Sequence, residues 1–197
     1  MYDLSRAASQ LLLATSITLC SAGGMAAECT NEGYKNVLYE QPVWLVGTFG
    51  VTSTLPPGGS YTSSFSTPLP AASSLTDDAY FSEKHPWSQD TIWWDARVAE
   101  SSNNEIIITL DRIYLIIQLK IQADNNDIYT LYYLDENDTW QSAWEAGPTN
   151  QWGVTKRNSI DSVPPFATDR IKIIASGGDY QYSVSEIYGR GIAYDCD

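Results

Sequence analysis

The stretch DRIKIIASGGDYQYSVSEIYGRG, residues 169–191, predicts two β-strands joined by a glycine turn. Residues 169–175 form the first expected strand, residues 176–179 the turn, and residues 180–188 the second strand. Because side chains alternate between the two faces of a strand, five residues of the second strand are expected on one face: Tyr180, Tyr182, Val184, Glu186 and Tyr188. Four of them suit a buried or half-buried surface.

Glu186 is the member of this face that does not suit burial. A carboxylate that leaves water without a partner is costly, so the side chain needs a compensating environment. The sequence leaves three environments open: a position in water at the rim of the sheet, a salt bridge with Arg or Lys, and a bound cation.

The rest of the chain predicts an all-β protein. Short segments rich in β-branched and aromatic residues alternate with turn residues, and none shows a long helical period with caps. The expected strands are 43–54, 91–98, 105–110, 112–122, 127–134 and 139–146. The run Asp135 to Asp138 is expected to close a hairpin, and residues 60–74 to form a surface loop or an edge strand. Together these signals predict one antiparallel β-sandwich over residues 28–197, without internal repeats.

Two neighbouring tryptophans, Trp93 and Trp94, lie within one of these expected strands. Because they must point to opposite faces, one is expected in the core. The other is expected to face outward or to lie under a loop.

Composition narrows the range of partners. The 197 residues include 24 acidic and 11 basic side chains, which gives a net charge of −13. Such a field repels phosphate backbones and anionic lipid surfaces, so nucleic acid is not expected as a partner. The charge suits cations, neutral sugars or simply solubility in a salty exterior, and it does not distinguish among them.

Residues 1–27 resemble an export signal. Arg6 precedes an apolar run from Leu11 to Cys20, and small residues follow up to Ala26 and Ala27, where cleavage is expected. The apolar run is too short to anchor the chain in a bilayer, so no transmembrane segment is expected. The mature domain is therefore expected to be secreted, at the cell surface or in a periplasm.

Removal of this segment leaves two cysteines, Cys29 and Cys196. An even number in an exported protein favours a disulfide, which here would join the two ends of the domain. A zinc site is the weaker alternative, because the single histidine, His85, is distant from both cysteines in the sequence.

Several fragments occur in the order and spacing of a known family. They are LTDD at 75–78, TIWWD at 91–95, the segment 105–111, YYLDENDTW at 132–140, ATDR at 167–170, VSEI at 184–187 and Gly189. Together they resemble the discoidin family, also called the coagulation factor five/eight type C or galactose-binding-like domain, which includes sugar-binding modules attached to glycoside hydrolases. The resemblance implies an eight-stranded jelly-roll β-sandwich with a role in adhesion or targeting. Terminal cysteines joined across its base would also fit this family.

The resemblance also implies one structural calcium ion near the chain ends. Asp77 matches the family's turn aspartate, and Glu186 matches the glutamate of its last strand. Calcium binds about six to eight oxygens, so backbone carbonyls would complete the shell. Those expected are near Ser74, Ala79 and Ser185. The chain departs from the family at Asp78, where glycine is usual, and at Ala79, where a side-chain ligand is common, and Asp78 is itself a further candidate ligand.

Ligands of such sandwiches bind in loops at one end, through an aromatic platform and polar side chains. The candidates are His85, Trp87, Asp124, Asn126, Trp152 and Arg157. Trp87 could stack on the apolar face of a sugar while His85 donates or accepts a hydrogen bond, although Trp87 could instead pack over the core. The stretch 124–127 could hold sugar hydroxyls or serve only as a turn, and it lacks EF-hand spacing. Trp152 and Arg157 lie in another stretch that resembles a loop.

Catalytic motifs do not stand out. His85 has no adjacent Ser or Cys nucleophile motif, and the sequence has no phosphate loop and no paired-histidine metal motif. The many acidic residues could supply a glycosidase pair, but none stands in a recognisable site. We therefore expect a non-catalytic carbohydrate-binding module for glycans or polysaccharides. The alternative is a structural or adhesive extracellular protein of a surface layer, matrix or filament, which binds protein partners or itself through a sheet face or edge.

Overall fold

The computed structural model describes residues 33–53, 68–149, 151–159 and 163–194. These residues form an all-β fold with two short 3₁₀ helices and, within the described ranges, no α-helix. No helix in this part of the chain is long and apolar enough to cross a membrane. The expected export signal at 1–27, the two cysteines Cys29 and Cys196 and most of the expected loop at 60–74 lie outside the described residues.

Nine strands make up the fold. In chain order the elements are β1 (Lys35–Asn36), β2 (Val43–Val46), η1 (Ala72–Thr76), β3 (Ile92–Asp95), η2 (Ala99–Ser101), β4 (Glu105–Asp124), β5 (Ile128–Leu134), β6 (Trp140–Ala146), β7 (Val154–Asn158), β8 (Phe166–Ser176) and β9 (Gln181–Ala193). Every pair is antiparallel, and the hairpin turn at 135–138 joins β5 and β6. The predicted antiparallel β-sandwich is confirmed.

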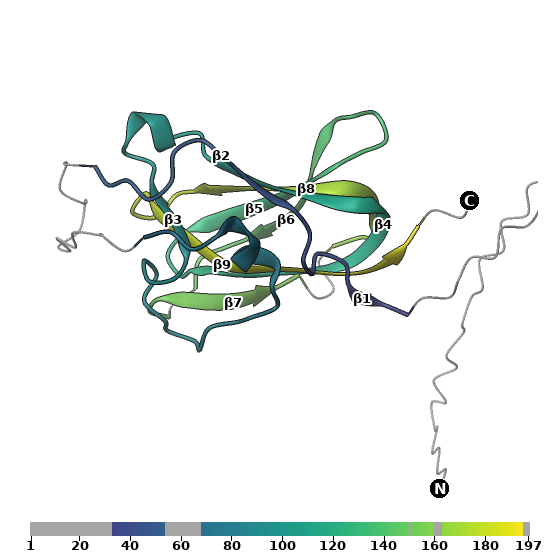
Figure 1. Ribbon diagram of the computed structural model, residues 1–197, viewed down its shortest axis with the longest axis horizontal. Helices are drawn as coiled ribbons and strands as arrows, with labels where there is room; N and C mark the ends of the chain where they lie inside the picture. The colour runs from purple at the N-terminus through teal and green to yellow at the C-terminus, as the bar shows by residue number, and fades with distance from the viewer. Residues whose placement is uncertain (1–32, 54–67, 150, 160–162, 195–197) are drawn as a thin grey trace, which may run out of the picture.

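The long strand β4 belongs to both layers of the sandwich. Its first half pairs with β2 and β8, and β5 and β6 extend that sheet beyond β8. Its second half pairs with β9 and β7, and β1 and β3 add to the far side of β9. Figure 1 shows these two groups as two layers, with β2 and β8 in one and β9 and β7 in the other.

The sequence predicted two strands, 105–110 and 112–122, where the structure has one. The pairing of β4 with β8 is irregular between Thr109 and Tyr114, and Tyr114 donates a hydrogen bond from its hydroxyl to Asp111 Oδ1 (2.8 Å). A strand that changes sheets bends at such an irregularity. The turn signal at Asp111 therefore marks a bend within β4 rather than the end of a strand.

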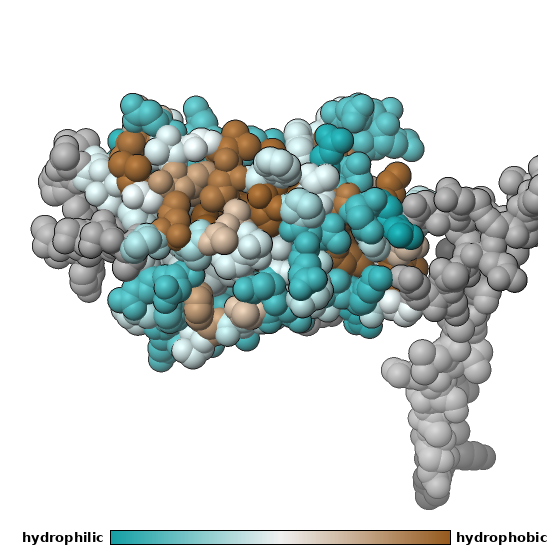
Figure 2. Space-filling model, in the orientation of Figure 1, coloured by the Kyte–Doolittle hydropathy of each residue, from teal (hydrophilic) through white to brown (hydrophobic). Residues whose placement is uncertain are grey.

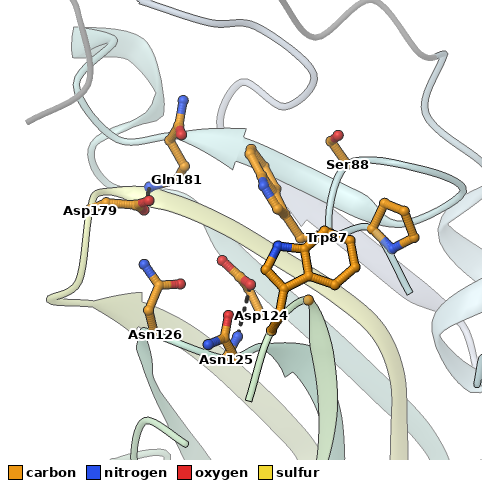
Figure 3. A pocket seen from close by; sticks show the side chains of 10 residues that line it. Trp87, Ser88, Asp124, Asn125, Asn126, Asp179 and Gln181 are labelled. Carbon is orange, nitrogen blue, oxygen red and sulfur yellow. Dashed lines mark hydrogen bonds between the residues drawn. The ribbon is translucent and has the colours of Figure 1, made fainter. Parts of the chain in front are cut away.

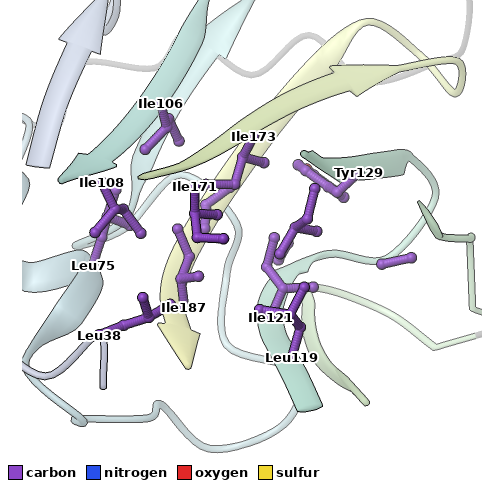
Figure 4. Close-up of a cluster of buried hydrophobic side chains, with 14 of the residues drawn as sticks. Leu38, Leu75, Ile106, Ile108, Leu119, Ile121, Tyr129, Ile171, Ile173 and Ile187 are labelled. Atoms are coloured by element: carbon purple, nitrogen blue, oxygen red, sulfur yellow. The ribbon is translucent and has the colours of Figure 1, made fainter. Parts of the chain in front are cut away.

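The core lies between the two layers. Figure 4 shows isoleucines of β4 and β8 on one side and aliphatic residues of β4, β9 and the segment after β1 on the other. The first group is Ile106, Ile108, Ile171 and Ile173, and the second is Leu38, Leu119, Ile121 and Ile187. Trp94 belongs to this core, whereas Trp93 is buried outside it and contacts Trp87 of the preceding loop. The expectation of one core tryptophan and one under a loop is confirmed.

A β-bulge changes the predicted face of β9. Gln122 of β4 pairs with Glu186, but its neighbour Ala123 pairs with Val184, so Ser185 is the extra residue. Val184 and Ile187 both reach the core, whereas Glu186 shares the outer face with its cross-strand partner Gln122. The prediction that one face carries Tyr182, Val184 and Glu186 together is therefore wrong, because the bulge interrupts the period of two.

Candidate functional site

A pocket of about 430 Å³ lies at one end of the sandwich, where four connections between strands meet. It is lined by Pro86, Trp87, Ser88, Asp124, Asn125, Asn126, Trp152, Gly153, Asp179 and Gln181. Figure 3 shows Trp87, Asp124, Asn126, Asp179 and Gln181 around the same hollow. The structure thus brings together four of the six candidate ligand residues: Trp87, Asp124, Asn126 and Trp152.

A backbone bridge holds the two tryptophan loops side by side. The N–H of Val154 donates to the His85 carbonyl (3.0 Å), and the N–H of Lys84 donates to the Val154 carbonyl (3.2 Å). The bridge therefore ties the loop that carries Trp87 to Val154 at the start of β7, two residues after Trp152. Trp152 is 60% exposed, and Trp87 is half-buried with its ring edge-to-face with Trp93 (centroids 6.3 Å apart).

Gly153 makes this close approach possible. Its φ of +68° lies in the left-handed region, and a Cβ at this position would overlap the His85 carbonyl oxygen. Only glycine avoids both the backbone strain and the overlap.

The turn after β4 is connected to the same loop. Asn125 donates from its side-chain amide to the Gln151 carbonyl, and its own carbonyl accepts from the Thr149 N–H (2.7 Å). Asp124 Oδ1 accepts from the Asn125 N–H (2.8 Å), as Figure 3 shows. The turn at 124–127, which the sequence left between a binding and a purely structural role, thus contributes pocket walls and also anchors the Trp152 loop.

Arg157 lies beneath the pocket rather than in a loop. It is on β7, where its side chain is buried, and the pairing with Ile121 of β4 places it inside the structure. Its guanidinium donates to the backbone carbonyls of Ala123 (3.1 Å), Asp127 (3.3 Å) and Ala146 (3.4 Å), and also to that of Asp124. The expectation of a loop position is wrong, and Arg157 holds the 123–127 turn in shape.

His85 is also outside the pocket lining. Its ring stacks on Phe81 with centroids 4.1 Å apart, and its Nε2 is 2.8 Å from the Gln89 carbonyl oxygen. The residue thus positions the Trp87 loop through its backbone and packs within that loop through its side chain.

Three aspartates converge on the pocket and the turn beside it. Asp124 is buried in the pocket wall and Asp179 is half-buried opposite, while Asp127 is completely buried behind them. Burial raises the pKa of Asp124 to about 6. Burial and the charges of Asp124 and Asp179 raise the pKa of Asp127 to about 9. At neutral pH the pair Asp124 and Asp127 therefore holds about one proton.

The sequence did not identify Asp179, Gln181 or the role of Asp127. Asp179 belongs to the turn between β8 and β9, and its Oδ1 accepts from the Gln181 N–H (3.0 Å). This turn reaches the pocket because β9 pairs with the end of β4, with Ala123 opposite Val184. The glycine turn was visible in the sequence, but its neighbours depend on a strand pairing that is not local.

The candidate calcium residues do not line this pocket. Glu186 is 0% exposed, and in the described part of the chain neither of its carboxylate oxygens has a hydrogen bond of normal geometry. Burial and the nearby Asp77 carboxyl raise its pKa to about 9, which the backbone N–H of Asp78 partly offsets. The rim position and the salt bridge are therefore both wrong, because Glu186 is not in water and pairs with no Arg or Lys among the described residues.

The other candidate calcium ligands lie in the 77–79 turn and at the bulge of β9. Asp78 has φ +61°, a conformation that favours glycine and that aspartate tolerates better than most residues. Aspartate is therefore tolerated at this position, where the resemblance led us to expect glycine. Ala79 donates its N–H to Asp77 Oδ1 (2.9 Å), and Ser185 is the bulged residue of β9. Within the described ranges no three His, Cys, Asp or Glu side chains are grouped closely enough to hold a metal ion, so any ion there would need backbone carbonyls.

Comparison with known proteins gives structural likenesses only. No family model matches the sequence, and no curated protein matches it. The family 32 carbohydrate-binding module of Clostridium perfringens NanJ, solved with galactose, is 13% identical with TM-score 0.48, over 78% of this chain and 96% of that one. The family 32 module of Streptococcus pneumoniae EndoD is 12% identical with TM-score 0.47, over 81% and 100%.

A third likeness is chitosan-binding module 1 of a Paenibacillus chitosanase/glucanase, at 14% identity and TM-score 0.44, over 79% of this chain and 98% of that one. All three TM-scores lie below 0.5.

Proposed function

We propose that this protein is an exported, non-catalytic carbohydrate-binding module that holds a glycan in the pocket of Trp87 and Trp152. The observation that carries the proposal is the composition of the pocket: two tryptophans from separate loops beside the carboxylates and amides of Asp124, Asn126 and Asp179. Sugars present apolar C–H faces and rings of hydroxyls, and such a wall offers partners for both.

The accessible ring of Trp152 suits this role. An exposed indole on a loop held by Gly153 and by Asn125 is preorganised, so binding costs little further ordering. Asp124 and Asn126 would accept and donate hydrogen bonds to hydroxyls, as carboxylate and amide groups do.

Matched tryptophan variants test this function. We expect Trp152→Ala to weaken binding of a soluble polysaccharide or oligosaccharide at least about tenfold, as removal of an aromatic anchor does. Trp44→Ala is the control, because Trp44 on β2 is 62% exposed, much like Trp152, and does not line the pocket. Isothermal titration against a panel of neutral and charged oligosaccharides measures both. Equal affinities of the two variants, or release of reducing sugar on prolonged incubation, would contradict the proposal.

A structural calcium ion at Glu186 is part of the same proposal. The fully buried carboxylate without a hydrogen-bond partner in the described residues fits a cation, because an ionised carboxyl in such a place is otherwise strongly unfavourable. Because no three acidic side chains are grouped there in the described residues, Glu186 and Asp77 would supply carboxylate oxygens and carbonyls near Ser74, Ala79 and Ser185 the remainder. The ion would fasten the 77–79 segment to β9 and would take no part in sugar binding.

We also propose that Cys29 and Cys196 form a disulfide. β1 pairs with β9, with Lys35 opposite Gly191, so the chain leaves both ends of the described fold from neighbouring strands. Cys29 precedes Lys35 by six residues, and Cys196 follows Gly191 by five. Titration of free thiols in the protein recovered from the periplasm or medium tests the pairing and the expected export together. Two free thiols in the exported protein would exclude the disulfide.

A protein contact through β2 is a second candidate function. β2 pairs only with β4 in the described part of the chain, and Trp44 and Val46 on it are 62% and 45% exposed. Figure 2 shows hydrophobic side chains gathered on the part of this face where Figure 1 places β2. Apolar side chains on a sheet edge favour pairing with another chain. Sedimentation over a range of concentrations, compared with a Trp44→Ser variant, would reveal self-association.

A further inference from the structure

The charged groups at the pocket are unbalanced. Asp124 and Asp179 line it, and no Lys or Arg is among the lining residues. The buried Arg157 directs its guanidinium to the backbone carbonyls of the 123–127 turn and of Ala146, not to a carboxylate oxygen. The pocket therefore presents two carboxylates with no ion-pair partner in its own lining, although the charge of Arg157 reaches Asp124 and that of Arg97 reaches Asp179 from outside it.

Asp127 is a further buried carboxyl beside Asp124 and Asp179. It is 0% exposed, and within the described residues no N–H or O–H donates to either of its carboxylate oxygens. Its side chain lies against the turn that carries Asp179, because a Cβ at Gly178 would overlap Asp127 Oδ1. Beside it stands the Asp124 carboxyl, and two carboxyls can share a hydrogen bond only while one of them is protonated. A positive group near Asp124 and Asp179 would let this pair ionise.

The aromatic walls favour the same kind of ligand. The faces of Trp rings attract cations, and carboxylates beside them strengthen this attraction. A sugar that carries an ammonium group offers both the C–H face for the indole and the charge for the carboxylates.

We propose that the pocket selects amino sugars with a free, protonated amine over neutral and N-acetylated sugars. This inference rests on the carbohydrate-binding function proposed above and narrows it to a cationic ligand class. Asp124 and Asp179 pair with the ammonium group, and Trp152 and Trp87 contact the ring. N-acetylation removes the charge and adds bulk, so it removes the ion pair while leaving the sugar ring unchanged.

Three trisaccharides of the same β-1,4 gluco backbone make the test. They differ at carbon 2, which carries an amine in the glucosamine trimer, an acetamide in the N-acetylglucosamine trimer and a hydroxyl in cellotriose. The titration is done at about pH 6, where an amine of this kind is protonated, and at low salt, which preserves ion pairs. The glucosamine trimer is expected to bind at least about tenfold more tightly than the other two sugars.

Charge-neutral variants locate the interaction. Asp179→Asn and Asp124→Asn keep the size of each side chain and are expected to remove the preference for the amine, that is, about tenfold in affinity. Asp138→Asn removes the same charge at the other end of β5, where Asp138 has φ +55°, which asparagine also tolerates. This control is expected to bind like the wild type. Melting curves of each variant show whether the fold is intact. If Asp124→Asn is unstable, the conclusion is drawn from Asp179→Asn, because Asp179 is the more exposed of the two residues.

Several results would overturn the inference, and they differ from those that overturn the general function. Equal binding of all three sugars would leave carbohydrate binding intact and refute only the preference for the amine. No binding of any sugar would remove both. Equal losses in Asp138→Asn and Asp179→Asn, or binding of trilysine as tight as that of the glucosamine trimer, would show attraction to the overall charge of −13 and refute the site.

Discussion

The backbones of His85 and Val154 form an isolated antiparallel bridge, with the Val154 N–H donating to the His85 carbonyl at 3.0 Å. The bridge joins two loops that are far apart in the sequence, and together with the Asn125 contact to the Gln151 carbonyl it holds Trp87 and Trp152 at the same pocket. The pocket therefore depends on a backbone contact as much as on the side chains that line it.

Replacement of Gly153 by alanine is expected to disrupt this bridge. The added Cβ would overlap the His85 carbonyl oxygen, and φ +68° is strained for alanine. We expect a loss of about 1–3 kcal/mol in the free energy of unfolding, together with a loss of sugar affinity. Chemical denaturation measures the first and calorimetric titration the second. Gly147→Ala is the control, because nothing lies within 4 Å of a Cβ placed there. If the two variants have the same free energy of unfolding and the same sugar affinity, the bridge does not shape the pocket.

Arg157→Lys tests the support beneath the pocket. A guanidinium reaches several carbonyls at once because its donors fan out in a plane, whereas an ammonium is a point charge. Loss of buried hydrogen bonds to Asp124, Asp127 and Ala123 is expected to cost about 2–4 kcal/mol, seen as a lower melting temperature. The control is Lys156→Arg, the reverse substitution at the neighbouring position on β7. The side chain of Lys156 is exposed, so this change is expected to leave the melting temperature unchanged. An unchanged melting temperature in Arg157→Lys would contradict the positioning role.

The carboxyl pair predicts an unusual pH dependence. Asp127 faces Asp124, Asp179, Arg157 and Tyr129, and its pKa is raised to about 9 by burial first and by the two aspartates next. A carboxyl whose pKa is higher in the folded state stabilises the fold while it is protonated, so the free energy of unfolding falls as the pH rises from about 4 towards 9.

Asp127→Asn removes this dependence. The neutral amide can donate to the Asp124 carboxylate at every pH, so the variant is expected to gain about 1–3 kcal/mol over the wild type near pH 9 and little near pH 4. The difference in melting temperature between the two proteins across this range is the measurement. A difference that does not grow with pH would show that Asp127 is ionised in the fold throughout.

The features that the sequence predicted correctly are those set by residues close together in the chain. The hairpin at 135–138 follows from four turn residues between two alternating strands, and Trp87, Asp124, Asn126 and Trp152 were found as loop aromatics and turn polar groups. The sandwich itself followed from strands of regular spacing without helical periods.

What the sequence did not reveal depends on partners distant in the chain. β7 was missed because VTKRN has no strong strand signal, and only its pairing with β4 turns Arg157 inward while Lys156 stays exposed. The bulge at Ser185 cannot be read from alternation, because it exists only relative to Gln122 and Ala123. The same bulge moved Glu186 from the core face to the outer face.

The position of Glu186 on that outer face leads to the last prediction, which concerns calcium. In the wild type, calcium is expected to raise the melting temperature by several degrees, because the ion binds the folded protein and not the unfolded chain. Glu186→Gln is expected to abolish this rise. In chelator the same variant is expected to melt no lower than the wild type, because burial already raises the pKa of Glu186 to about 9 and keeps the metal-free carboxyl neutral.

The two measurements separate a metal ligand from a merely structural residue. If Glu186 were only structural, Gln would shift the melting temperature equally with and without calcium. Glu145→Gln, an exposed change on β6, controls for the loss of one negative charge. A wild type that does not respond to calcium would leave Glu186 as a protonated acid packed under the 77–79 segment, and the proposed ion would be excluded.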